Sequence, residues 1–217
     1  MTFGVGIQCM TYNHSKYILD ALNGFVMQET DFPFVILLVD DASTDDNCLL
    51  IKDYLIKNFR VEDSNTAYYK ETDYAYISYA QHNSNRNCYI ATIYLKYNHY
   101  QIGKKMEKLK YLSEWLNRCK YVALCEGDDY WTDPQKLQKQ VAFMDTNEEY
   151  SLCFHNANII YEGTDRSVKS FTKINKSCDI TFKQLTSSWI IPTASIIYKR
   201  DLMDYYPDWM GIYIVEI

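Results

Sequence analysis

Three short, largely apolar runs, each followed at once by a cluster of polar side chains, constrain the fold of this chain most strongly. The runs span residues 3–10, 34–39 and 120–125, and the polar clusters span residues 11–15, 40–46 and 126–129. Continuous apolar runs of this length are typical of strands buried on both faces of a parallel sheet. Because the carboxyl ends of parallel strands share one edge, we expect the three polar clusters to lie together.

Amphipathic helical patterns separate these strands. The clearest places Ile18, Ala21, Leu22 and Phe25 on one stripe that can pack against a sheet. Further helical stripes are expected within residues 50–55, 106–116 and 137–144, and a fourth strand at residues 89–97. The alternation of strand and helix predicts an α/β fold with a mainly parallel sheet and right-handed crossovers.

Two segments show weaker patterns. Residues 60–87 are polar and tyrosine-rich without a sustained period, so we expect an irregular segment with one short helix at residues 74–81. After Tyr150 we expect a strand at residues 152–161, a helical turn at 182–187 and a strand at 190–199 that Pro192 interrupts. A chain of 217 residues without a clear linker suits a single domain, residues 1–217.

Composition argues against several classes of function. The chain carries a formal charge of −6 with dispersed basic residues, whereas a nucleic-acid groove needs clustered lysine and arginine. Its seven cysteines include no Cys-x-x-Cys pair, so we expect reduced thiols rather than disulfides or a zinc site. The chain also lacks a signal-peptide pattern and an apolar run long enough to cross a bilayer, so we expect a cytoplasmic protein.

The acidic turn after the run at 120–125 is the strongest chemical signal. Glu126, Asp128 and Asp129 surround Gly127, and three carboxylates so close together repel one another unless a positive partner sits among them. Carboxylates without a neighbouring imidazole or thiolate favour Mg²⁺ or Mn²⁺, which take further ligands from water and substrate phosphates. Gly127 would let the backbone approach a ligand closely. A solvated acidic turn is the alternative.

Other signals are absent or ambiguous. The histidines at positions 14, 82, 99 and 155 have no partner at a metal-ligand spacing, so we expect surface or hydrogen-bonded core residues. The Asp40–Asp41 pair suits helix capping, although Asp41 can also face a ligand crevice. The chain contains no phosphate-binding P-loop, no Gly-x-Gly-x-x-Gly turn and no Gly-x-Ser-x-Gly elbow.

Three blocks, Val5 to Asn13, Val39 to Asp45 and Tyr121 to Pro134, together resemble the family 2 glycosyltransferases. These are inverting enzymes of the GT-A fold that use nucleotide-sugar donors, and similar members commonly build bacterial surface polysaccharides. The resemblance spans residues 3 to 205 and is weakest between 60 and 100. It implies a Rossmann-like GT-A sheet with a smaller mixed C-terminal part. Residues 1–130 would form the nucleotide-sugar-binding half and residues 131–217 an incomplete acceptor-side half.

The resemblance also implies roles for individual residues. Asp41 would contact the base, usually uracil, and Glu126 takes the place of the first aspartate of the family's Asp-x-Asp motif. Glutamate at that place is a departure, which leaves open which carboxylate touches the metal. The implied metal ligands are Asp128 and Asp129, and the implied donor-binding residues are Met10, Thr11, Tyr12, Asn13, Asp41, Lys104, Glu126 and Asp128. Lys105 is an alternative to Lys104 for the diphosphate.

In the resembling enzymes a carboxylate in a later segment deprotonates the acceptor hydroxyl, while Mn²⁺ or Mg²⁺ neutralises the leaving nucleoside diphosphate. This chain has no clear counterpart of that segment. Asp208 is the candidate base, with Asp204 and Glu216 as the other late carboxylates. We therefore expect either a C-terminally shortened chain or an altered base.

The resemblance implies that the protein transfers a sugar from a UDP-sugar to a saccharide or lipid-linked acceptor. It leaves open whether the protein associates peripherally with a membrane. A first alternative is a catalytically impaired domain that binds a nucleotide sugar and lacks the general base. A second is a nucleotidyltransferase, although the chain lacks the glycine-rich basic loop expected near the N-terminus of such an enzyme.

Overall fold

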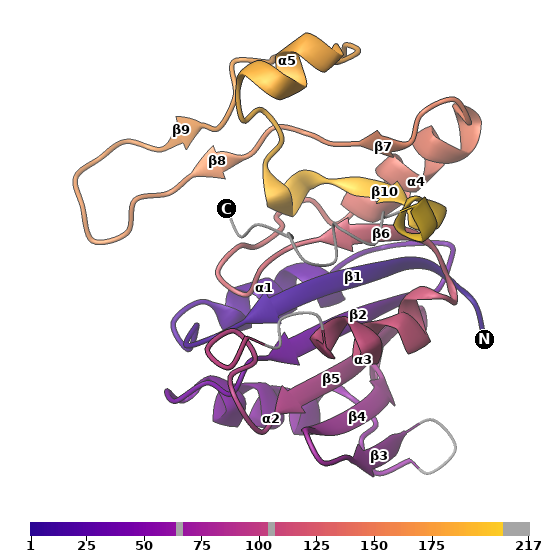
Figure 1. Ribbon diagram of the computed structural model, residues 1–217, viewed down its shortest axis with the longest axis vertical. Coiled ribbons are helices and arrows are strands. Elements are labelled where there is room, and N and C mark those ends of the chain that lie inside the picture. Colours follow the sequence, from indigo (N-terminus) through magenta and orange to yellow (C-terminus); the bar gives the residue numbers. More distant parts are fainter. Residues whose placement is uncertain (64–66, 104–106, 206–217) are drawn as a thin grey trace.

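An eight-stranded sheet forms the centre of the computed structural model, which describes residues 1–63, 67–103 and 107–205 (Figure 1). Its strands are β1 (Phe3–Thr11), β2 (Phe34–Asp40), β3 (Tyr68–Glu71), β4 (Ala75–Gln81), β5 (Cys88–Leu95), β6 (Cys119–Leu124), β7 (Leu152–Cys153) and β10 (Ile197–Lys199). They lie in the order β3-β4-β5-β2-β1-β6-β10-β7. The central strands β5, β2, β1 and β6 run parallel, and the strands outside them pair antiparallel. The predicted α/β fold is confirmed.

Helices cover both faces of the sheet. They are α1 (Ile18–Val26), α2 (Asn47–Asn58), α3 (Glu107–Leu116) and α4 (Lys136–Thr146). Apolar side chains of α1, α2 and α4 join one core cluster, and those of α3 join the cluster on the other face. Every residue of β2 is buried, which explains its unbroken apolar sequence. The stripe predicted for α1 is confirmed, since Ile18, Ala21, Leu22 and Phe25 are all fully buried.

The short helix predicted at residues 74–81 is wrong, because this stretch forms β4, which pairs with β5 and with the edge strand β3. Ala75 and Ile77 face the core while Tyr76 between them is exposed, the period of two expected for a strand. The interspersed tyrosine and serine residues weakened this alternation in the sequence. Within the segment predicted to be irregular, residues 68–71 and 75–81 therefore form strands that extend the sheet.

The strands of the C-terminal part are shorter than predicted. The helical turn at 182–187 is confirmed as α5 (Phe182–Ser187), but the strand predicted at 152–161 is wrong. It is replaced by β7 and by β8 (Asn158–Ile159), which pairs in a separate small sheet with β9 (Lys169–Ser170). Asn156 diverts the chain, because its side chain accepts from Thr172 N and donates to Thr172 O.

The strand predicted at 190–199 is also largely wrong, since β10 is the only strand within it. The 3₁₀ helix η1 (Thr193–Ser195) precedes β10, and Ser195 N donates to the carbonyl of Pro192 at 3.0 Å. A second 3₁₀ helix, η2 (Arg200–Tyr205), follows β10. Among the described helices, none has both the length and the apolar composition needed to span a bilayer.

Candidate functional site

The three polar clusters meet at the carboxyl edge of the central strands, on the left in Figure 1. The end of β1 joins the other two: Asp41 N donates to Thr11 O at 3.0 Å, and Gly127 N donates to Met10 O at 2.9 Å. Both later turns are thus hydrogen-bonded to the last residues of β1. The adjacency predicted from the sequence is confirmed.

The turns after β1 and β2 interlock through side chains. Asn13 has a φ of +57°, a left-handed conformation that asparagine tolerates better than most residues. Its Oδ1 accepts from Thr44 N at 2.7 Å, and its own N–H donates to Ser43 Oγ at 2.9 Å. Asp45 Oδ2 accepts from Ser15 N at 3.0 Å. These bonds fix residues 11–15 relative to the second turn.

The two neighbouring aspartates at the end of β2 have different surroundings. Asp40 accepts hydrogen bonds from Ser43, Asn47 and the thiol of Cys48, so it organises the turn. Asp41 is 7% exposed, and its Oδ1 accepts from His99 N at 2.7 Å. Asp41 is therefore a carboxylate held in one orientation beside Thr11 at the sheet edge.

Gly127 lies where no other residue fits. A Cβ atom built on it would lie 2.7 Å from Thr11 Cβ and 3.0 Å from His14 Nδ1. The close backbone approach inferred from the sequence is thus to Thr11 and His14 of this chain, and it brings the acidic turn against the turn after β1.

His14 is the functional candidate that the sequence analysis missed. Its Nε2 lies 3.8 Å from Asp128 Oδ2, so a protonated ring would pair with that carboxylate. Its Nδ1 is buried and has no hydrogen-bond partner among the described residues. The sequence predicted a positive group among the carboxylates, and His14 is a side chain of this chain that can supply one. The signal available in the sequence was the position of His14 within the first polar cluster, residues 11–15.

Charge crowding in the acidic turn is visible in Asp129. The pKa of its carboxyl lies above the usual range, chiefly because the surrounding chain shields it from water and also because Asp128 is negative; His14 acts in the opposite direction. A divalent cation bound here would relieve that repulsion, so the residues fit a metal. Across residues 1–63, 67–103 and 107–205, no three Asp, Glu, His or Cys side chains gather as a complete metal site. A metal held by Asp128 and Asp129 would need further ligands from a substrate.

A buried lysine supports the segment that follows the acidic turn. Lys136 is 4% exposed; its Nζ lies 3.9 Å from the centre of the Trp131 ring and 2.7 Å from Gln140 Oε1. Burial lowers the pKa of this amine to about 7. Trp131 Nε1 in turn donates to Ala194 O at 2.7 Å, which joins the segment after the acidic turn to η1. No motif or periodic pattern marks this lysine, which lies among the buried residues of α4.

The structure brings most of the predicted site residues to this edge, at the end of β1 and in the turns that follow β1, β2 and β6. They are Met10, Thr11, Tyr12, Asn13, Asp41, Glu126, Asp128 and Asp129. Lys104, Lys105 and Asp208 lie outside the described residues.

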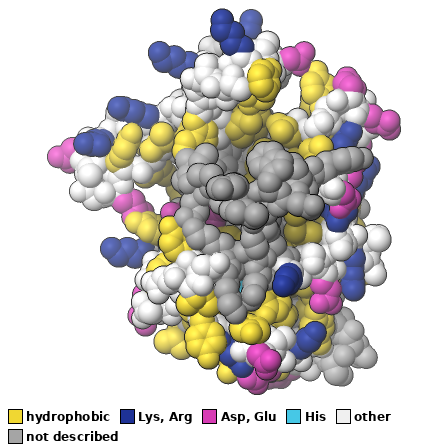
Figure 2. Space-filling view, in the orientation of Figure 1, with side chains coloured by type: hydrophobic (Ala, Val, Ile, Leu, Met, Phe, Trp, Pro, Cys, Tyr) yellow, Lys and Arg dark blue, Asp and Glu magenta, His cyan; other side chains and the backbone are white. Residues whose placement is uncertain are grey.

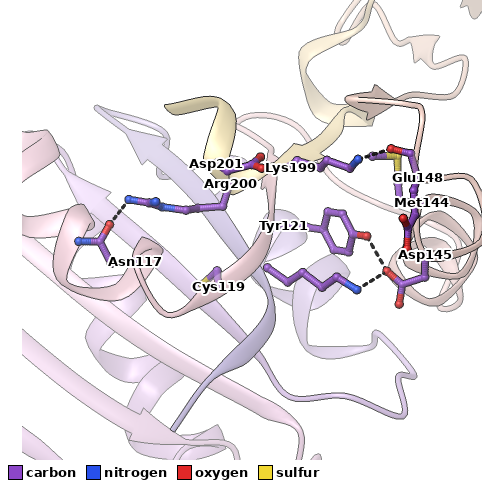
Figure 3. A pocket seen from close by; sticks show the side chains of 10 residues that line it. Asn117, Cys119, Tyr121, Met144, Asp145, Glu148, Lys199, Arg200 and Asp201 are labelled. Carbon is purple, nitrogen blue, oxygen red and sulfur yellow. Dashed lines mark hydrogen bonds and ion pairs between the residues drawn. The ribbon is translucent and has the colours of Figure 1, made fainter. Parts of the chain in front are cut away.

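A cavity of about 520 Å³ lies away from these turns, at the opposite edge of the sheet, between α4, the start of β6 and the end of β10 (Figure 3). Its polar groups pair with one another: Asp145 Oδ1 accepts from Tyr121 at 2.5 Å and from Lys120 at 2.8 Å. Lys199 Nζ donates to Glu148 O. This network joins α4 to the sheet and is separate from the candidate site.

Solved structures share this architecture. Staphylococcus aureus TarS matches 94% of the chain with a TM-score of 0.53 and 20% identity over 50% of its own length. TarS has also been solved with UDP and with UDP-GlcNAc. The mannosyltransferase PcManGT of Pyrobaculum calidifontis, in complex with GDP-Man and Mn²⁺, matches 94% of the chain with a TM-score of 0.52 and 14% identity, over 46% of its length. These similarities establish a fold that the chain shares with nucleotide-sugar-binding proteins.

Relatives found by sequence have a higher identity to the chain than these solved structures, and they are longer than the chain. The uncharacterized proteins Rv1520 of Mycobacterium tuberculosis (strain H37Rv) and Mb1547 of Mycobacterium bovis are each 33% identical to the chain over 196 residues. The match covers 90% of this chain and 47% of each relative, so the chain spans about half the length of these proteins. The chain matches no protein-family model.

Proposed function

We propose that the chain is the donor-binding domain of a glycosyltransferase and transfers a sugar from a UDP-sugar to a saccharide or lipid-linked acceptor. The observation that carries this proposal is the hydrogen-bonded assembly of three turns at one sheet edge, with Asp41 and Asp128 in two of them. Ligands of open α/β sheets bind at this edge. The fold shared with TarS and PcManGT supports the same reading.

The donor binds across the end of β1 in this proposal. Met10 to Asn13 line the nucleotide pocket. Asp41 accepts a hydrogen bond from an N–H group of the base, and uracil is the base that we propose. Interlocking of the first two turns supports these assignments, because a pocket that is rigid before binding loses little entropy when the ligand arrives. Glu126 and Asp128 complete the donor site, and Lys104 contacts the diphosphate.

Asp128 and Asp129 hold Mn²⁺ or Mg²⁺. When bound, the metal supplies charge neutralisation for the departing nucleoside diphosphate. His14 contributes by packing against Gly127 and orienting Asp128. The raised pKa of Asp129 supports this assignment, since a site that concentrates negative charge favours a cation.

In this proposal residues 131–217 form the acceptor side of the site, so the acceptor binds beyond Trp131. A carboxylate there removes the proton from the acceptor hydroxyl, which attacks the anomeric carbon as the bond to the nucleoside diphosphate breaks, with inversion. Asp208 is our candidate for this base. Synthesis of a bacterial surface polysaccharide is the context we propose for the reaction.

Sugar transfer tests the proposal directly. The chain is incubated with UDP-sugars, Mn²⁺ and saccharide acceptors, and UDP release and the anomeric configuration of the product are followed by NMR. We expect release that depends on metal and acceptor and that Asp128→Asn abolishes. Asp53→Asn, an exposed carboxylate of α2, is the matched control and should retain activity. Donor binding without transfer would overturn the enzymatic assignment and leave a nucleotide-sugar-binding domain.

A further inference from the structure

Residues 154–191, here called the arm, leave the sheet after β7 and return to it at η1 (Figure 1). The arm contains the β8–β9 hairpin and α5, and no residue of α5 is buried. A helix of this length is unstable by itself in water and gains its stability from packing. The arm is therefore built to contact something besides the core of this domain.

Large apolar side chains are exposed along the arm. Phe182 is 81% exposed, Leu185 45% and Trp189 59%, and the hairpin adds Ile160 at 52% and Val168 at 57%. Phe182 and Leu185 are three residues apart on α5, so they share one side of the helix. Leu185 and Trp189 also line a surface hollow of about 440 Å³. Exposed apolar groups that gather in this way mark an interaction surface.

The same segment is basic although the chain is acidic. The arm has five basic and three acidic residues, a net charge of +2, whereas the whole chain carries −6. Two of its carboxylates are engaged by tyrosines, Asp179 by Tyr150 and Glu162 by Tyr17. Its lysines, Lys169, Lys173, Lys176 and Lys183, are exposed and form no ion pair with any described residue. Figure 2 shows dark blue and yellow side chains next to one another at the top and upper left of the molecule, where α5 and the β8–β9 hairpin lie in Figure 1.

We propose that the arm docks this domain on an anionic lipid bilayer. Exposed phenylalanine, leucine and tryptophan side chains enter the boundary between headgroups and acyl chains, where tryptophan is favoured. Unpaired lysines beside them are attracted to anionic headgroups. A second copy of the chain is a poorer partner for this surface, because two basic arms would repel each other.

Docking through the arm would bring the candidate site close to the membrane surface. The hydroxyl of Tyr17, at the start of α1, donates to Glu162 of the arm, so the arm lies next to the turn that carries Asn13 and His14. Provided that the proposed function holds, an acceptor carried on a lipid would then reach the site from the bilayer. The docking surface itself requires neither donor nor catalysis.

Co-sedimentation with lipid vesicles tests the proposal. We expect the chain to sediment with vesicles of phosphatidylglycerol and phosphatidylcholine, to remain in solution with phosphatidylcholine alone, and to be released by high salt. Equal binding to both kinds of vesicle, or to neither, would overturn the proposal. The assay contains no nucleotide, so its result is independent of sugar transfer.

Matched variants locate the binding surface. Lys176→Glu with Lys183→Glu should weaken vesicle binding about tenfold or more. The same exchange at two exposed lysines outside the arm, Lys57 of α2 and Lys70 of the edge strand β3, should change binding much less. Phe182→Ser should also weaken binding, and Ile56→Ser, at a residue 68% exposed on α2, should not. Equal losses in the arm and control variants would contradict docking through the arm. So would a dimer in light scattering that the arm variants abolish.

Discussion

The carboxyl edge of the sheet and the arm are both made of turns and short elements, yet they are held in different ways. At the edge, hydrogen bonds join residues far apart in the sequence: the Asn13 side chain accepts from Thr44 N, and Gly127 N donates to Met10 O. In the arm, α5 buries none of its residues. A site that must match a small polar ligand needs preorganised groups, whereas a surface that meets lipid needs exposed apolar side chains.

Two phenylalanines give the largest expected contrast between these regions. Phe25 is fully buried and meets the Trp131 ring edge to face at 5.1 Å, whereas Phe182 is 81% exposed. Phe25→Ala should lower the free energy of unfolding by about 3–5 kcal/mol, because it removes core contacts and leaves a cavity. Phe182→Ala should change it by less than about 0.5 kcal/mol. Urea denaturation measures both, and similar losses would show that α5 is part of the core.

The buried amine of Lys136 predicts a stabilising substitution. Lys136→Met should raise the free energy of unfolding by about 1–4 kcal/mol below pH 7, because it removes the cost of burying a charge. The pKa of about 7 in the folded protein lies below that of the unfolded chain. Between these values the unfolded chain binds more protons, so the parent protein should gain stability as the pH rises above 7.

The Lys136→Met variant should lose that pH dependence, which denaturation at several pH values will show. Lys139→Met is the matched control on the same helix, because Lys139 is exposed and pairs with Asp133 at 2.8 Å. A stability difference between parent and Lys136→Met that stays constant from pH 6 to 10 would contradict a buried titrating amine.

Glycine substitutions test the packing of the acidic turn. Gly127→Ala should cost about 1–3 kcal/mol and abolish nucleotide binding, since its Cβ meets Thr11 Cβ at 2.7 Å. Gly163→Ala, in the arm, meets nothing within 4 Å and bears only the strain of its φ of +66°. It should cost about 1 kcal/mol and leave nucleotide binding unchanged. Retention of nucleotide affinity by Gly127→Ala would argue that the acidic turn is not part of the donor site.

Substitution of His14 should have the smallest effect. His14→Leu should weaken binding of UDP with Mn²⁺ about three- to tenfold while His14→Gln, which keeps a polar group near Asp128, retains more of the affinity. Calorimetry at fixed pH measures both variants. If both variants bind UDP with Mn²⁺ equally tightly, the role of His14 is limited to packing against Gly127.

Much of this fold could be predicted because apolar patterns report burial. The unbroken run of β2 and the stripe of α1 each have one simple burial pattern, and both predictions hold. In β4 only Ala75 and Ile77 mark the alternation, and Ala80 packs on the other face of the sheet, so tertiary pairing decides the structure. Asn156, between β7 and β8, likewise bonds to Thr172, a contact that no local pattern reveals.

The candidate site could be predicted as a set of turns but not as a set of contacts. The turns after β1, β2 and β6 meet because these strands run parallel, and this was predicted from the alternation of strand and helix patterns. The contact of His14 with Gly127, and the position of Lys136 beside Trp131, depend on distances across the fold. Single residues of this kind carry no periodic or motif signal.

Calorimetric titration of UDP, with Mn²⁺ and again with a chelator, tests the central claim that the acidic turn binds a metal and a nucleotide together. We predict metal-dependent binding to the parent protein that favours UDP over other nucleoside diphosphates. Asp128→Asn and Asp129→Asn should each lose this binding, and the α2 control Asp53→Asn should keep it. Binding of UDP with Mn²⁺ that is as tight in both acidic-turn variants as in the parent would contradict the account.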